Sequence, residues 1–262
     1  MIRQPVALTS ALRPMQKLLE IIFEDDGLLV INKPADLVCH PTKSDAFSSL
    51  ISRVRLYLGE NGPPHLVNRL DRETSGVIIV AKNDAAAREL RRSWETGAVN
   101  KQYRAIVHGH PRVDQALIDA PLGRDEQSCV AIKNCVRPDG APSRTEFRVE
   151  RRFVRVEGEF TVLRVRPHSG RKHQIRIHLA HFGHPVVGDK LYGGDERLYL
   201  DFVTSRLTPE QRLRLLLPCH ALHASELGFC WLGEHRTFRA EAEGWFRDFE
   251  LGQFRERVVE EQ

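Results

Sequence analysis

The order of the predicted elements constrains the fold of this chain more than any other feature. Short apolar runs that predict strands alternate with helical segments, but no regular strand–helix–strand repeat is present. This irregular order favours an α+β fold over a doubly wound one. Helix starts are indicated by capping residues at Ser44 or Asp45, at Asn83 or Asp84, and at Thr208. The expected strands are 21–24, 28–32, 77–82, 101–109, 147–149, 160–165 and 227–231, and the expected helices are 44–58, 83–95, 172–181 and 208–218.

The chain is expected to form one catalytic-size domain, because its 262 residues show no internal repeat and no clear linker. We expect a polar lead-in over 1–20, a domain over 21–250 with a helical insertion at about 195–217, and an acidic tail over 251–262. The longest apolar run, 77–81, is far shorter than the ~20 residues that a membrane helix needs. The first residues also lack the apolar core of a signal peptide. These features predict a cytoplasmic protein that does not enter a membrane.

Basic residues are concentrated in one part of the sequence. Residues 144–176 contain ten Lys or Arg and four Asp or Glu, a local net charge of +6 in a chain whose total is +4. Such a stretch suggests a polyanionic partner. The alternative is a solvated surface of mixed charge, since 145–150 and 159–166 alternate charged with apolar residues. Charge alone leaves both interpretations open.

Cofactor motifs are missing from the sequence. It contains neither a GxxxxGK[ST] phosphate loop nor a GxGxxG turn, so a nucleotide cofactor is not expected. Two groups of side chains could be imagined as metal ligands. The first consists of His173, His178, His181 and His184 with Asp189, and the second of Cys219, His220, His223 and Cys230. Neither group has a standard zinc spacing. Histidines that face an interface or a phosphate are therefore favoured over a metal site.

The segment that most resembles an active site is 65–82, HLVNRLDRETSGVIIVAK. Asp71 lies between Arg69 and Arg72, in a loop just before an apolar strand. Two neighbouring cations favour the ionised carboxylate, which makes Asp71 a candidate nucleophile or base. A surface salt bridge is the alternative. A glycosidase-like carboxylate pair with Glu73 is a third possibility, but nothing in the sequence fixes the separation of the two groups.

Five segments, in order, resemble the RluA-type pseudouridine synthases. The first is RLDRETSG at 69–76, which closely resembles the signature of that family. The others are EDDGLLVINKPADLVCHP (24–41), KQYRAIVHG (101–109), HSGRKHQIRIHLAHFGHPVVGDKLYG (168–193) and HALHASELGF (220–229). The resemblance implies isomerisation of uridine to pseudouridine in RNA. The N1–C1′ bond breaks, the uracil rotates, and C5 bonds to C1′, without a metal, nucleotide or redox cofactor.

The resemblance also implies roles for individual residues. Asp71 matches the catalytic aspartate, Tyr103 the tyrosine that stacks on the target uracil, and Arg176 the arginine that pairs with the aspartate. A carboxylate in this place can attack C1′ or remove a proton from C2′ to give a glycal, and the resemblance favours the glycal. A base taken out of its stack needs a flat platform, which Tyr103 would supply.

Other matched residues would contact the RNA around the reacting nucleotide. Arg69 matches the arginine associated with the gap that the flipped nucleotide leaves. Arg171, Lys172 and the arginines of 144–166 would bind phosphates and position the RNA without reading its sequence. One departure is Asn68, where the family usually has histidine, because an amide cannot titrate near neutral pH. This puts an acid–base role at this position in doubt.

The implied fold is the pseudouridine synthase fold, with a mixed, mainly antiparallel central sheet flanked by helices and a central RNA-binding cleft. The expected partner is ribosomal or transfer RNA, with the uridine in a loop or single strand, and a monomer without an obligate protein partner is expected. Only about twenty residues precede the matched region, too few for an additional RNA-binding module. Substrate choice is therefore expected from the domain itself, aided by the 195–217 insertion. A non-catalytic RNA-binding protein with the same fold is the alternative function.

Overall fold

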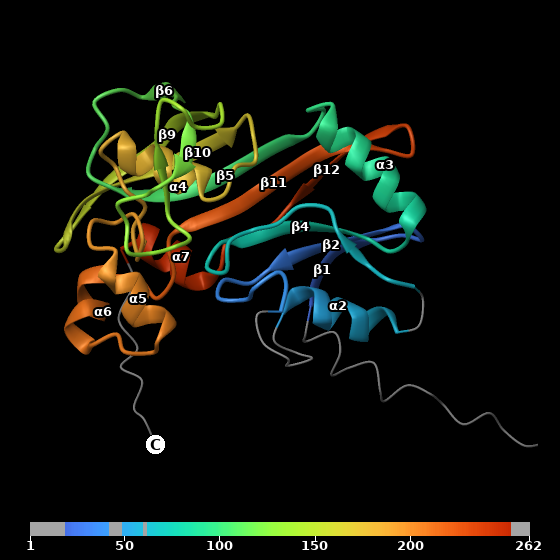
Figure 1. The fold of residues 1–262 in the computed structure, drawn as a ribbon, viewed down its shortest axis with the longest axis horizontal. Helices are drawn as coiled ribbons and strands as arrows, with labels where there is room; N and C mark the ends of the chain where they lie inside the picture. The colour runs from blue at the N-terminus through green and yellow to red at the C-terminus, as the bar shows by residue number, and fades with distance from the viewer. Residues whose placement is uncertain (1–18, 42–48, 60–61, 253–262) are drawn as a thin grey trace, which may run out of the picture.

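A large, mainly antiparallel sheet runs through the computed structural model, which describes residues 19–41, 49–59 and 62–252 (Figure 1). Its main path has the order β1-β2-β4-β11-β5-β10-β9-β6, with β3 paired to β4 and β12 paired to β11. The strands are β1 (Glu20–Glu24), β2 (Leu28–Lys33), β3 (His65–Leu66), β4 (Ser75–Ala81), β5 (Asn100–His108), β6 (Gln115–Asp119), β9 (Arg144–Arg155), β10 (Gly158–Pro167), β11 (Leu222–Trp231) and β12 (Glu234–Arg239). A separate hairpin consists of β7 (Leu122–Arg124) and β8 (Asn134–Val136).

The pairing confirms the predicted mixed, mainly antiparallel sheet. The described strand pairs are antiparallel except β4 with β11, where Ser75 pairs with His223 and Gly76 with Ala224. At this crossing a Cβ on Gly76 would lie 2.2 Å from the carbonyl oxygen of Ala224, and the φ of Gly76 is +114°. Only glycine fits such an approach. The start of β4, and with it the loop that carries Asp71, is thereby held against β11.

Helices flank both halves of the sheet (Figure 1). In Figure 1 α2 and α3 accompany the half made by β1, β2 and β4, whereas α4, α5 and α6 lie with the half made by β5, β10 and β9. No helix among the described residues is long and apolar enough to cross a membrane. The helices are α2 (Leu50–Leu58), α3 (Asp84–Glu95), α4 (Gln174–His181), α5 (Arg197–Val203), α6 (Pro209–Leu215) and α7 (Gly244–Glu250).

The capping signals predicted some helix ends correctly. Asn83 caps α3 by accepting a hydrogen bond from the backbone of Ala86, and Thr208 forms the predicted capping box of α6. The prediction that α6 extends to 218 is wrong: α6 ends at Leu215 because Leu216 has a left-handed conformation with φ of 65°. The helix predicted from 172 begins at Gln174, because His173 is also left-handed.

Some predicted features fall on residues outside the described ranges. Ser44 and Asp45 lie there, and α2 begins at Leu50, capped by the side chain of Ser49. Most of the lead-in over 1–20 and of the tail over 251–262 lies outside as well. The 195–217 segment is described and consists of α5, α6 and their connections.

Three apolar clusters form the core. One joins β5, β9 and β10 to α4 and α7; a second joins β1, β2 and β4 to α2; a third packs β2, β4, β11 and β12 on α3. Tyr103 of β5 packs against both the first and the second cluster. It therefore lies where the two halves of the molecule meet.

Candidate active site

Asp71 lies in a tight turn between β3 and β4. The chain before it runs along β4, with Val67 donating its backbone N–H to Ile79 at 2.9 Å. The amide of Asn68 continues this ladder: its oxygen accepts from the Ile79 backbone at 2.7 Å, and its nitrogen donates to the Val77 carbonyl at 3.2 Å. Thr74 then closes the turn by donating its backbone N–H to the Asp71 carbonyl at 3.2 Å. Asn68 thus fixes the loop through hydrogen bonds of its side-chain amide. These hydrogen bonds do not depend on a group that titrates near neutral pH.

Asp71 and Arg176, which are 105 positions apart, are brought together by the fold. Nη1 of Arg176 donates to Oδ2 of Asp71 at 2.9 Å. The rest of the guanidinium is bound by Asp189, which accepts from Nε at 2.7 Å and from Nη2 at 2.8 Å. The Arg176 and Asp189 side chains are 6% and 0% exposed, whereas the Asp71 carboxyl is 26% exposed. Of these three charged residues, Asp71 is therefore the one that a substrate can reach.

Backbone groups hold Asp189 in place. Its Oδ1 accepts from the backbone N–H groups of Leu191 at 2.9 Å and Tyr192 at 3.0 Å. Burial alone would raise the pKa of Asp189, but the charge and hydrogen bonds of Arg176 outweigh it and hold that pKa well below its usual range. The ring of Tyr192 lies 5.0 Å from the Arg176 guanidinium carbon. Arg176 is thus fixed on one face by a buried bidentate ion pair and on another by an aromatic ring.

The surroundings of Asp71 favour its ionised form. Burial would raise the pKa of Asp71, but His173, Arg176 and His220 together lower it below its ordinary value. His173 Nε2 lies 3.9 Å from Asp71 Oδ1, and its Nδ1 shares a hydrogen bond of 2.9 Å with the Tyr192 hydroxyl. Burial lowers the pKa of His173 to about 4, so its imidazole is neutral at neutral pH. The resting Asp71 carboxylate is therefore ionised and can act as a base or a nucleophile.

A buried lysine supports the same loop. Lys33 donates its ammonium protons to the carbonyls of Pro34 at 2.7 Å, Leu37 at 2.9 Å and Arg72 at 3.0 Å. Its side chain is fully buried, and this desolvation lowers its pKa to about 8. Because Arg72 directly follows Asp71, Lys33 ties the Asp71 turn to the end of β2.

Tyr103 packs against the apolar cluster that contains Leu70, the residue before Asp71. The pKa of Tyr103 is raised by burial and by the negative charge of Asp71, so its phenol stays neutral. Its hydroxyl makes no hydrogen bond to any other described residue. The structure therefore brings the predicted Asp71, Tyr103 and Arg176 together in one site.

The predicted RNA-contacting residues are exposed near this site. Arg69 precedes Asp71 by two positions and forms no ion pair or hydrogen bond with other residues in the described ranges. Arg171 and Lys172 lie in the exposed loop before α4. That loop is held by Gln174, whose Oε1 accepts from the Arg171 backbone at 3.1 Å and from the Ser169 hydroxyl at 2.6 Å. The three cations are thus carried by the two segments that supply Asp71 and Arg176.

Several arginines of 144–166 are already paired with acidic side chains, so not all of them can contact RNA phosphates. Arg144, Arg152 and Arg164 form ion pairs with acidic residues at 2.8–2.9 Å. Arg148 and Arg166 are exposed, and neither has a polar partner within the described parts of the chain. The charge of this segment is therefore partly neutralised by its own neighbours.

Glu73 does not form a carboxylate pair with Asp71. It is 6% exposed, and its carboxylate forms an ion pair with the Lys190 ammonium. His220 Nδ1 lies 3.5 Å from its other oxygen. The glycosidase-like arrangement needs two carboxyl groups that face one substrate bond, and this geometry does not provide it.

Two of the histidines considered as metal ligands, His178 and His223, use both ring nitrogens in hydrogen bonds. His178 contacts the Thr145 hydroxyl at 2.7 Å and the Ala120 carbonyl at 2.9 Å. His223 contacts the Ser75 hydroxyl and the Ala240 carbonyl, both at 2.9 Å. No group of three or more His, Cys, Asp or Glu side chains in the described ranges is placed to hold a metal ion.

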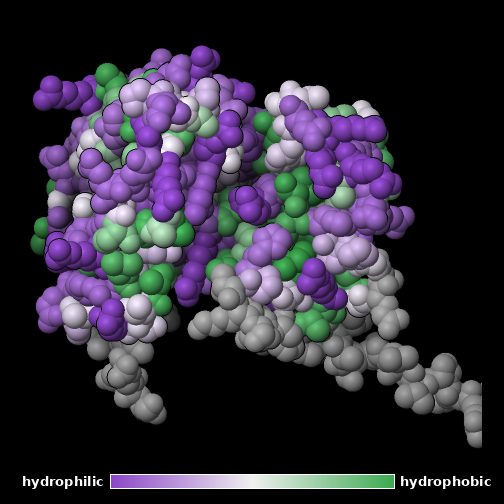
Figure 2. Space-filling model, in the orientation of Figure 1, coloured by the Kyte–Doolittle hydropathy of each residue, from purple (hydrophilic) through white to green (hydrophobic). Residues whose placement is uncertain are grey.

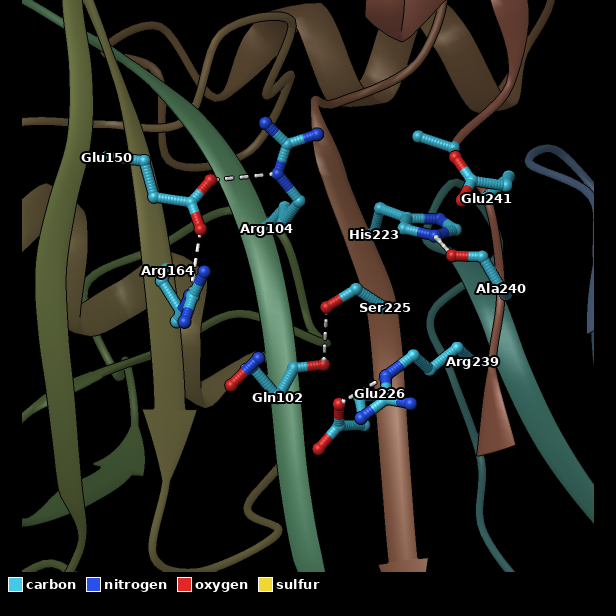
Figure 3. A pocket seen from close by; sticks show the side chains of 11 residues that line it. Gln102, Arg104, Glu150, Arg164, His223, Ser225, Glu226, Arg239, Ala240 and Glu241 are labelled. Atoms are coloured by element: carbon cyan, nitrogen blue, oxygen red, sulfur yellow. Dashed lines mark hydrogen bonds and ion pairs between the residues drawn. The ribbon is translucent and has the colours of Figure 1, made fainter. Parts of the chain in front are cut away.

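The molecular surface is hollowed between the two halves of the protein, and hydrophobic residues show beside hydrophilic ones in this hollow (Figure 2). A different pocket, of about 470 Å³, is lined by Arg104, Glu150 and Arg164 (Figure 3). Arg104 follows Tyr103 in β5, so its side chain points to the opposite face of the sheet. Glu150 binds both arginines, at 3.0 and 2.8 Å. The Glu150 carboxylate of this pocket is therefore neutralised by two cations.

The partner that fixes Arg176 is not indicated by the sequence patterns. Those patterns suggest Asp189 only as a metal ligand, although it lies in the GDKLYG segment of the matched motifs. Lys190 and Tyr192 of the same segment also contact site residues. The only available signal was the position of these residues inside a matched block.

The chain is similar to several known proteins. A profile of the family described as RNA pseudouridylate synthase matches residues 27–181. The Vibrio vulnificus dual-specificity RNA pseudouridine synthase RluA is 35% identical over 226 residues, which cover 86% of this chain and 82% of that protein. The Zymomonas mobilis ribosomal large subunit pseudouridine synthase D is 34% identical, covering 80% and 64%. The structure of human RNA pseudouridylate synthase domain containing 1 superposes with a TM-score of 0.68 at 26% identity, covering 92% and 86%.

Proposed function

Because this chain belongs to the RluA-type family of RNA pseudouridine synthases, we propose that Asp71 is its catalytic carboxylate. The chain isomerises uridine to pseudouridine in RNA, as its family does. The observation that carries the role of Asp71 is its partly exposed carboxylate, held at 2.9 Å by the buried Arg176. Such a pair keeps the carboxylate ionised without removing it from the substrate.

The reaction requires no strong acid, since the uracil anion is delocalised over two carbonyl groups. In the route that the resemblance favours, Asp71 takes a proton from C2′ while the N1–C1′ bond breaks, which gives a glycal and a uracil anion. The uracil rotates, C5 bonds to C1′, and the protonated Asp71 returns its proton to C2′. The hydrogen on C5 is then lost to solvent, and N1 gains a proton. In the other route Asp71 forms an ester with C1′, which C5 displaces.

The two routes differ in whether the C2′–H bond of the target uridine breaks. Deuterium at C2′ of the target uridine slows the glycal route by a primary isotope effect, because the C2′–H bond breaks. The ester route leaves that bond intact and shows only a small effect. Single-turnover rates on the labelled and unlabelled RNA separate the two.

Tyr103 provides the flat surface on which the extruded uracil stacks, in our proposal. Its ring lies between the two apolar clusters and close to Asp71. Arg69 then occupies the gap in the RNA, while Arg171 and Lys172 bind phosphates. Since the base must leave its stack, an unpaired uridine in a loop is the favoured target.

The target RNA is proposed from the relatives and the site together. A relative is named as a ribosomal large subunit enzyme, which favours ribosomal RNA over transfer RNA. We propose that α5 contributes to this choice, since its Phe202 ring lies 5.0 Å from the guanidinium carbon of Arg72, beside Asp71. Hydrophobic residues gather over α5 in Figure 2. A cytoplasmic monomer is part of the same proposal.

Tritium release tests the role of Asp71. RNA from cells that lack this gene is labelled at C5 of uridine and incubated with wild-type protein or Asp71→Asn. C5 loses its hydrogen only when it becomes the glycosidic carbon, so wild type is expected to release tritium and Asp71→Asn is not. Equal release by both proteins would refute the proposed role.

A further inference from the structure

A second buried ion pair runs beside the one that binds Asp71. Asp71 and Glu73 belong to the same turn, and Asp189 and Lys190 are adjacent in the facing loop. Arg176 bridges Asp71 and Asp189, while Glu73 pairs directly with Lys190. The same two loops are therefore joined twice, once through the reactive carboxylate and once behind it.

The Glu73–Lys190 pair is too deeply buried to contact RNA. The two side chains are 8% and 2% exposed. The Lys190 ammonium also donates to the Pro218 carbonyl at 2.7 Å and lies 4.7 Å from the centre of the Phe202 ring. It thus connects the Asp71 turn, its own loop, the segment before β11, and α5.

His220 strengthens the same connection from the side of β11. Its Nε2 shares a hydrogen bond of 2.7 Å with the Thr74 hydroxyl, and its Nδ1 lies 3.5 Å from Glu73 Oε2. Burial would raise the pKa of Glu73, but the imidazole of His220 and the charge of Lys190 outweigh it and lower that pKa. Glu73 is therefore ionised, and it anchors the end of the turn that begins at Asp71.

Asp71 itself is held loosely by direct contacts. One oxygen accepts one hydrogen bond from Arg176, and the other has His173 at 3.9 Å. A single bond leaves a carboxylate free to shift, so its position depends on the backbone of the turn. That backbone is fixed on one side by Lys33 and on the other by Glu73.

We propose that the Glu73–Lys190 pair is a positioning device for the isomerisation. It holds the Asp71 carboxylate at the distance from Arg176 and the ribose that the reaction needs, and it does not contact the substrate. This proposal rests on the proposed catalytic role of Asp71. A misplacement of about 1 Å can lower a rate by about 100-fold even when binding is intact.

The test compares Glu73→Gln, Lys190→Met and the double variant on a transcript that carries the uridine modified by wild type. Each protein is assayed well below its own melting temperature, where circular dichroism shows it to be folded. We expect kcat to fall by about 10- to 100-fold in each single variant, with KM within about twofold of wild type. The double variant is expected to lose no more than the worse single one, because both remove the same connection.

Glu250→Gln is the matched control. Glu250 accepts two hydrogen bonds from Arg104, at 3.0 and 3.1 Å, on the other face of the sheet, and its side chain is 15% exposed. This variant is expected to lower the melting temperature and to leave kcat unchanged. It separates loss of stability from loss of positioning.

Two results would overturn the proposal. One is a wild-type kcat in both Glu73→Gln and Lys190→Met, which would make the pair purely structural. The other is a raised KM with unchanged kcat, which would indicate contact with RNA. In both cases Asp71→Asn stays inactive, whereas failure of the proposed role of Asp71 would show as pseudouridine formation by Asp71→Asn.

Discussion

Asp189→Asn tests whether the buried charge behind Arg176 holds the site together. Asp189 is fully buried and binds Arg176 through two parallel hydrogen bonds of 2.7 and 2.8 Å. Asparagine has the same shape and keeps one oxygen for the backbone groups of Leu191 and Tyr192. Its NH₂ group then faces the Arg176 donors, so the charge and at least one hydrogen bond are lost.

The cost follows from burial. A hydrogen bond to a charged group contributes about 1.5–3 kcal/mol, and removal of one partner of a buried pair costs about 3–5 kcal/mol. We expect the free energy of unfolding to fall by about 3–5 kcal/mol. With a urea dependence of about 3 kcal/mol per molar, the unfolding midpoint falls by about 1–2 M.

The matched control is Asp139→Asn. Asp139 binds Arg137 through two hydrogen bonds of 2.7 Å, but its side chain is 68% exposed. Solvent screens such a pair, so its urea midpoint is expected to stay within error of wild type. Urea titrations followed by circular dichroism measure both variants. Equal midpoints for Asp189→Asn and Asp139→Asn would refute the argument that burial makes the Arg176 pair important.

Three further predictions concern the site. Burial lowers the pKa of His173 to about 4, so the unfolded chain binds a proton that the folded chain does not between pH 6.5 and 4. The free energy of unfolding therefore falls by about 3 kcal/mol as pH falls through this window, and His173→Gln removes this part of the pH dependence in urea titrations. Tyr103→Ala is expected to lower kcat/KM by the equivalent of about 1–3 kcal/mol of transition-state stabilisation, because the ring carries the stacking. Tyr103→Phe keeps the ring and is expected to lower kcat/KM less. Equal losses in the two variants would contradict this. The double variant Arg171→Gln, Lys172→Gln is expected to reduce the salt dependence of RNA binding and to leave kcat unchanged. The slope of log K against log salt, measured by filter binding, is expected to become shallower by about 1.4. An unchanged slope would rule out phosphate contacts by these two residues.

The sequence predicts best those parts of the fold that local chemistry decides. Asn83 and Thr208 predict the starts of α3 and α6 because a cap acts within one turn of the helix. The end of α6 was mispredicted because Leu216 takes a left-handed conformation while Leu215 and Leu217 are buried. Tertiary packing, and not the local sequence, decides that end.

The site was predictable only in part. Asp71, Tyr103 and Arg176 were found because they lie in matched motifs, and the structure brings them together. The ion pair between Arg176 and Asp189 depends on how the loop after α4 folds back against that helix, and no local sequence pattern encodes this. The same holds for Glu73, whose partner lies 117 positions away.

The most direct test of the account measures RNA binding and pseudouridine formation with the same preparation of Asp71→Asn. The account predicts that this variant binds RNA with wild-type affinity and salt dependence, while the pseudouridine content of the RNA, measured by mass spectrometry of its nucleosides after chemical derivatisation, stays at the level without enzyme. Pseudouridine formation by Asp71→Asn at a rate near that of wild type would contradict the central claim that this carboxylate carries the reaction.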